Sequence, residues 1–91
     1  MTEHVIQVPY SHLHPGLVLD APADTQDFLV LFGDDSESRA QLLHDHTGRP
    51  VLRMGGYMTA NGTVIDERVW TIRETARHGP RLHLRLGDSL P

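Results

Sequence analysis

The stretch that decides the fold runs from Val51 to Ile72 and reads VLRMGGYMTANGTVIDERVWTI. At its centre stands the pair Asn61-Gly62, and strand-forming residues flank the pair on both sides. Asn and Gly both accept positive φ, which a type I′ turn requires of its two central residues. The stretch therefore predicts a β-hairpin with a two-residue turn at Asn61-Gly62.

A two-residue turn also predicts which residues lie opposite each other. Arg53 would face Trp70, Met54 would face Val69, and successive side chains would alternate between two faces. One predicted face is apolar and would join the core: Leu52, Met54, Met58, Ala60, Ile65 and Val69. The other is amphipathic and would be exposed: Arg53, Tyr57, Thr59, Asp66, Arg68 and Trp70.

Gly55 and Gly56 interrupt the first predicted strand of this hairpin. Glycine inside a strand packs nothing, so it usually marks a bulge, a sharp bend or a close backbone approach. We interpret the pair as the corner of a barrel. The alternative is a gap where the backbone of a partner, or a ligand, lies against the sheet.

Length and composition limit the class of protein. Ninety-one residues predict one small β domain, residues 1–91, with a small core. The absence of cysteine excludes disulfides and thiolate metal sites, and it fits a reducing compartment. The longest apolar run, Phe28–Phe32, is too short to span a membrane, and the N-terminus lacks a signal-peptide pattern. We therefore expect a cytoplasmic protein with no membrane association.

The charges are divided unevenly along the chain. The net charge is −4, and all eight basic residues are arginine. Residues 1–48 carry one arginine against eight acidic residues, a net of −7, whereas residues 49–91 carry seven arginines against four acidic residues, a net of +3. Unless the halves interleave, this division predicts an acidic end and a basic face. The overall negative charge argues against nucleic acid as a partner.

Further segments have the alternating or uniformly apolar pattern of short strands: residues 4–8, 17–19, 27–32, 39–45 and 81–86. Residues 39–45 also fit a short helix, but the apparent hairpin loop after them favours a strand. The six or seven strands predict an all-β fold, a small antiparallel meander closed into a barrel or folded into a two-layer sandwich.

An α+β fold with a C-terminal helix near residues 66–78 is the alternative. Val69, Ile72 and Ala76 have helical spacing, and Gly79-Pro80 follows them as a helix stop. The β-branched and aromatic residues between Val64 and Ile72 favour a strand instead.

Two His-x-His pairs are the candidates for metal binding: His12 with His14, and His44 with His46. Residues two apart on a strand point to the same side, so each pair would offer two imidazoles to one ion. If the pairs met, the four nitrogens would suit Zn or another transition metal better than Ca or Mg. The alternative is that these histidines are solvated at strand ends, and our first expectation includes no cofactor.

The amphipathic face of the hairpin is the candidate binding surface. If the strand over 81–86 pairs with the strand that carries Trp70, the surface gathers Trp70, Arg53, Tyr57, Arg68, Arg81, His83 and Arg85. Arg, Trp and Tyr are the residue types enriched at binding hot spots.

The usual catalytic patterns are missing: G-x-S-x-G, a phosphate-binding glycine loop and a cysteine nucleophile. The sequence therefore predicts a non-catalytic binding or accessory module that docks a protein partner, or a second copy of itself, through this face. One alternative is a His-x-His metal-binding protein or small metal-dependent enzyme. The other is a single-strand nucleic-acid binder that uses the same face.

Overall fold

The computed structural model describes residues 4–90, and all regular structure in this range is β-strand. The strands are β1 (Val5–Val8), β2 (Val18–Pro22), β3 (Asp27–Phe32), β4 (Glu37–His44), β5 (Pro50–Met54), β6 (Tyr57–Met58), β7 (Val64–Ile65), β8 (Arg68–His78) and β9 (Arg81–Ser89). The predicted all-β fold is confirmed. The alternative C-terminal helix is wrong, because β8 covers most of its residues. No segment within 4–90 is a helix that could cross a membrane.

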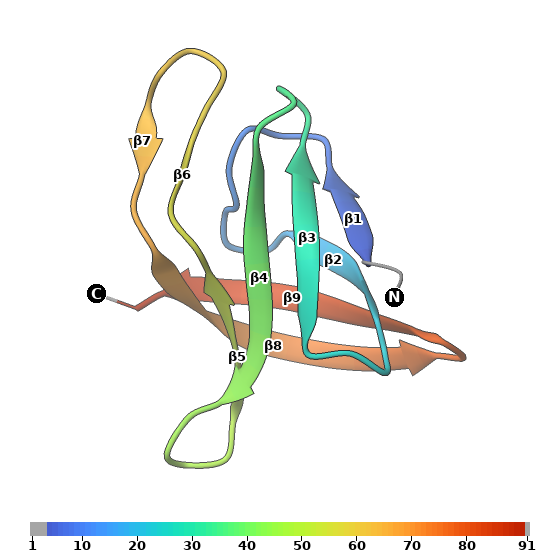
Figure 1. The fold of residues 1–91 in the computed structure, drawn as a ribbon. Helices are drawn as coiled ribbons and strands as arrows, with labels where there is room; N and C mark the ends of the chain where they lie inside the picture. Colours follow the sequence, from blue (N-terminus) through green and yellow to red (C-terminus); the bar gives the residue numbers. More distant parts are fainter. Residues whose placement is uncertain (1–3, 91) are drawn as a thin grey trace.

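Seven strands form one sheet in the order β1-β3-β4-β5-β8-β9-β2, which curls into a nearly closed barrel (Figure 1). From β3 to β9 the main-sheet strands follow one another as an antiparallel meander, as predicted. The edges differ from a meander, because β1 pairs in parallel with β3 and β2 pairs with β9. These pairings bring the edge strands β1 and β2 near each other.

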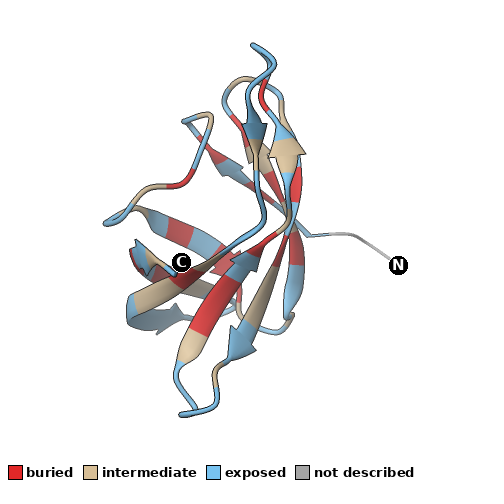
Figure 2. Cartoon of the chain, turned by 90° about the vertical axis from the view of Figure 1, so that its left-hand side faces the viewer, coloured by how far each residue is buried: buried red, intermediate tan, exposed pale blue. Residues whose placement is uncertain are grey.

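The core lies inside the curled sheet, where buried and exposed residues alternate along the strands (Figure 2). The uniformly apolar β3 contributes Phe28, Val30 and Phe32, all buried. On β9, Leu84 and Leu86 are buried and Leu82 is partly buried, as the alternating pattern predicts. Outward residues on the same strand are polar or charged, so the two-residue period positions the core.

The hairpin turn differs from the prediction. The N–H of Gly62 donates to the carbonyl of Thr59 at 3.0 Å, and the N–H of Thr59 donates to the carbonyl of Thr63 at 2.9 Å. Gly62 has a φ of 88°, whereas Asn61 is not among the residues with positive φ. A type I′ turn needs both, so the loop is the three-residue kind that ends in a left-handed glycine.

The extra loop residue moves the register by one. Trp70 lies opposite Leu52, Arg53 opposite Val69 and Tyr57 opposite Ile65. The predicted register, with Arg53 opposite Trp70, is therefore wrong. Because a shift of one residue exchanges the faces of a strand, Trp70 joins the core side and Val69 turns outward with Arg53.

Gly55 and Gly56 separate β5 from β6, which belongs to a small two-stranded sheet with β7. We call residues 55–67 the arm (Figure 1). The N–H of Gly55 donates to the carbonyl of Arg39 at 3.0 Å, and the Ser38 hydroxyl donates to the carbonyl of Gly55 at 2.6 Å. These bonds are the last contacts with β4 before the arm leaves the main sheet, so the pair marks the point where the chain passes from one sheet to the other, not the barrel corner of our interpretation.

Candidate functional site

The predicted binding face is divided between two sides of the sheet. Tyr57, Arg68 and Trp70 line one pocket on the inner side. The other four members, Arg53, Arg81, His83 and Arg85, have partly exposed side chains on the outer side. The division follows from the register, because Arg53 now lies opposite Val69 instead of Trp70.

The pocket has a volume of about 180 Å³ and lies between the β1–β2 loop and the arm, against the barrel. Trp70 is only 6% exposed, and Leu13 and Met54 are also buried. These three side chains give the pocket an apolar base, and exposed polar residues surround it. Its full lining is His12, Leu13, Met54, Tyr57, Val64, Ile65, Asp66, Arg68 and Trp70.

A second hollow of about 460 Å³ adjoins the pocket and shares His12 and Ile65 with it. The rest of its lining is mostly polar and comes from the β1–β2 loop, the turn after β3 and the arm tip: Ser11, Asp34, Thr59, Ala60, Asn61 and Thr63. We call the two hollows together the arm groove.

Tyr57 fastens the base of the arm to the barrel. Its ring stacks on Phe32 with centroids 4.6 Å apart and planes 11° from parallel. Its hydroxyl donates to the carbonyl of Ser11 at 2.9 Å. Burial raises the pKa of Tyr57, and the negative charge of Asp34 raises it further. The hydroxyl therefore stays protonated and keeps donating at neutral pH.

Asp34 fastens the tip of the arm. One carboxylate oxygen accepts from the N–H of Ala60 at 2.9 Å. The other accepts from the N–H of Ser36 at 3.1 Å and from the Ser36 hydroxyl. The bond from Ala60 is the main cause that lowers the pKa of Asp34, and the bonds from Ser36 add to it. Asp34 thus links the β3–β4 turn to the arm as a carboxylate.

The arm is apolar on both faces. Tyr57 and Ile65, which pair with each other, line the pocket. Met58 and Val64, the next pair, turn outward and are 61% and 65% exposed. The sequence prediction that Met58 joins the core is wrong, because the inward positions change from even to odd numbers between Met54 and Tyr57.

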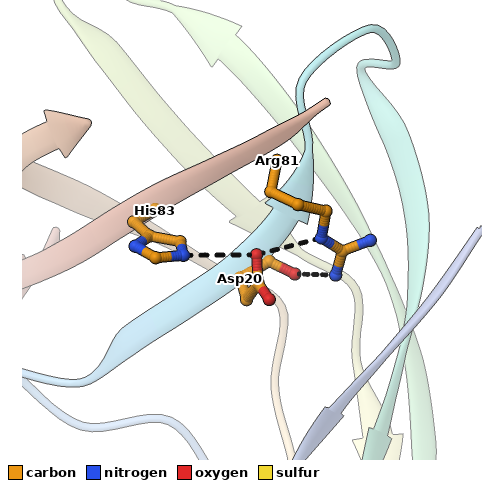
Figure 3. A network of polar contacts seen from close by, with 3 residues as sticks. All are labelled: Asp20, Arg81 and His83. Carbon is orange, nitrogen blue, oxygen red and sulfur yellow. Dashed lines mark hydrogen bonds and ion pairs between the residues drawn. The ribbon is translucent and has the colours of Figure 1, made fainter. Parts of the chain in front are cut away.

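On the outer side, Asp20, Arg81 and His83 form a polar cluster (Figure 3). Nε of Arg81 donates to a carboxylate oxygen of Asp20 at 3.0 Å, and Nη2 donates to the Asp20 carbonyl at 2.8 Å. Nε2 of His83 lies 3.5 Å from the same carboxylate oxygen. The bond from Arg81 is the main cause that lowers the pKa of Asp20.

The other two outer arginines of the predicted face, Arg53 and Arg85, are also paired. Arg85 lies 3.8 Å from Glu74, and Arg53 forms an ion pair with Glu67. Exposed pairs of this kind contribute little to stability.

His78 also lies on the outer side, although the sequence analysis did not single it out. The centroid of its ring is 4.6 Å from that of the His83 ring. Its position opposite Arg81 is set by the turn at Gly79-Pro80.

The His-x-His pairs do not form the predicted four-nitrogen site. His12 and His14 lie in the β1–β2 loop, where Nδ1 of each is near a local oxygen, the Ser11 hydroxyl at 3.2 Å and the Pro15 carbonyl at 3.1 Å. His44 is the last residue of β4, and His46 lies in the loop between β4 and β5. Within residues 4–90, no three His, Cys, Asp or Glu side chains are arranged to hold a metal ion.

Several residues in or beside the groove had no signal in the sequence. Leu13, Met58 and Val64 are ordinary apolar residues, and only the fold determines which of them is buried. Asp34 could have been noted as a turn residue, since Asp followed two residues later by Ser is a common turn pattern. Nothing in the sequence identifies Ala60 as the partner of Asp34.

Comparison of the chain with protein-family models, with curated proteins and with solved structures found no match.

Proposed function

We propose that this protein is a non-catalytic module that binds a protein partner in the arm groove. The observation that carries the proposal is the arm itself. Tyr57 and Ile65 line the pocket, while Met58 and Val64 are largely exposed, with Val64 also reaching the edge of the pocket. Monomeric proteins seldom leave adjacent large apolar side chains uncovered, and such a patch next to a groove is typical of an interaction site.

The residue types around the groove support the same function. Tyr57, Arg68 and Trp70 are the three residue types most enriched at interface hot spots, and here they line one pocket. A partner segment that enters the groove would bury them further. Met58 and Val64 would then pack against a neighbouring part of the partner.

The outer side of the sheet is less suited to binding a partner. The guanidinium groups of Arg53, Arg81 and Arg85 already face carboxylates. A single-strand nucleic-acid surface needs free cations together with exposed aromatic rings, and Trp70 is buried. For this reason we locate the partner in the groove.

Site-specific photocrosslinking tests the proposal. A photoreactive amino acid is placed at position 58, at position 64 or, as the control, at Leu43 on β4, which is also an exposed large apolar residue. We expect the same partner to crosslink at 58 and 64 and not at 43. Excess unlabelled protein should compete with the crosslink, whereas the Met58→Asp/Val64→Asp double variant should not.

Each result of the crosslinking experiment leads to a different conclusion. Equal crosslinking at 43, or competition by the double variant, would contradict the assignment of the groove. A crosslink between two copies of the chain would identify the partner as a second copy, and sedimentation equilibrium over a range of concentrations would then give the oligomeric state.

A further inference from the structure

The guanidinium group of Arg68 has no charged partner among the residues that the structure describes. Arg53, Arg77, Arg81 and Arg85 all lie within ion-pair distance of a carboxylate. The side chain of Arg68 makes no hydrogen bond or ion pair with any of residues 4–90, although its backbone pairs with Met54 in the sheet. Asp66 lines the same pocket but does not pair with it. The pocket therefore contains a guanidinium group with its donors free.

The surroundings of Arg68 make a bound anion favourable. Trp70, Met54 and Leu13 are buried and line the same pocket, so apolar surface lies beside the exposed Arg68 side chain. Hydrogen bonds between charged groups strengthen where water is excluded, and a guanidinium group binds a carboxylate with two parallel bonds. The carboxylate of Asp66 lines the same pocket and opposes the bound anion, which lowers the affinity that Arg68 provides.

We propose that this pocket binds the free C-terminal carboxylate of a partner chain whose last side chain is apolar. The pocket offers a cation next to apolar surface within about 180 Å³. A C-terminal residue such as leucine carries a carboxylate and an apolar side chain on the same carbon. An internal Asp or Glu has the carboxylate but not the apolar group beside it. This inference rests on the proposed function and names the part of the partner that enters the groove.

Trp70 makes the test direct, because it is the only tryptophan in the chain and lines the pocket. Its fluorescence is followed while N-acetyl-leucine is added to about 50 mM, a range that detects millimolar binding. We expect a saturable change. N-acetyl-leucinamide lacks the charge, and N-acetyl-aspartic acid α-amide carries it on the side chain. Both should need at least about tenfold higher concentration, which corresponds to about 1.4 kcal/mol.

Variants assign the effect to Arg68. Arg68→Gln should abolish the saturable change, and Arg68→Lys should weaken it because lysine cannot make the two parallel bonds. Asp66→Asn should tighten binding by removing the like charge. Arg85→Gln, on the outer side, is the matched control and should bind as the unaltered protein does. Circular dichroism establishes that each variant is folded.

Three results would overturn the inference: no saturable change, equal binding of the leucinamide, or equal binding to the folded Arg68→Gln variant. Equal binding of the aspartic acid amide would overturn the assignment to a C-terminus. None of these bears on the crosslinking at positions 58 and 64, so failure here is distinguishable from failure of the proposed function.

Discussion

The carboxylate of Asp34, in the turn between β3 and β4, accepts a hydrogen bond from the backbone N–H of Ala60 at the tip of the arm. The two residues are 26 positions apart in the chain, so this bond ties the arm to the β3–β4 hairpin of the main sheet. Tyr57 makes the other attachment, at the base of the arm. The width of the groove therefore depends on a small number of polar and aromatic contacts.

Removal of the Asp34 carboxylate should loosen the arm without unfolding the barrel. In Asp34→Ala the N–H of Ala60 loses its acceptor, and we expect its hydrogen exchange to become several-fold faster. Amides of the β8–β9 pairing should keep their protection. Glu37→Ala is the matched control, because it removes a nearby exposed charge that has no partner among residues 4–90. Equal exchange at Ala60 in both variants would show that the bond does not hold the arm.

The hydrogen bond between Asp34 and Ala60 should be lost as the pH falls. Hydrogen bonds from Ala60 and Ser36 lower the pKa of Asp34 below its ordinary value of 3.8. A carboxyl group whose folded-state pKa is lowered stabilises the structure above its unfolded-state pKa, and this contribution is lost as the pH falls through the folded-state pKa. The amide chemical shift of Ala60 should therefore titrate with a midpoint below 3.8. A midpoint at or above that value would contradict the bond.

Trp70 should contribute strongly to stability. It is 6% exposed and lies opposite Leu52. We expect Trp70→Ala to lower the free energy of unfolding by about 3–5 kcal/mol and Trp70→Phe to lower it less. Urea denaturation measures both. Val64→Ala, at a position 65% exposed, is the control and should change stability by no more than about 0.5 kcal/mol. If Trp70→Ala is as mild as the control, the register described here is wrong.

Gly62 should be required for its backbone conformation. Its φ of 88° is unfavourable for residues with a Cβ, and a Cβ there would meet no other atom within 4 Å. We therefore expect Gly62→Ala to lower the free energy of unfolding by about 1–2 kcal/mol through backbone strain alone. Gly62→Asn should cost less, because asparagine adopts this conformation more readily. Equal stability of the alanine variant and the unaltered protein would argue against a left-handed residue at this position.

Strand positions could be predicted from the sequence because the apolar pattern follows burial directly. Asp27–Phe32 was predicted to the residue, and the strand over 81–86 lies within β9. The parallel pairing of β1 with β3 could not be predicted, since it joins segments separated by β2 and its flanking loops. Nothing in the local pattern of either strand specifies such a distant partner.

The candidate site was predicted in part, and the failure has one physical cause. An Asn-Gly pair suits a two-residue turn, but it also suits a three-residue loop with only the glycine left-handed. Sequence does not separate the two, and the difference of one residue moves Trp70 from the surface to the core. Tyr57, Arg68 and Trp70 line one pocket, whereas Arg53 lies opposite Val69 on the other side of the sheet.

The affinity of the crosslinked partner, once purified, for two matched double variants tests the central claim most directly. Met58→Asp/Val64→Asp places charges on the outer face of the arm, and Val5→Asp/Val18→Asp places the same charges on exposed valines of the edge strands. Titration calorimetry should give a dissociation constant at least about tenfold weaker for the arm variant, and unchanged for the edge variant. Equal dissociation constants for both variants and the unaltered protein would contradict binding at the arm groove.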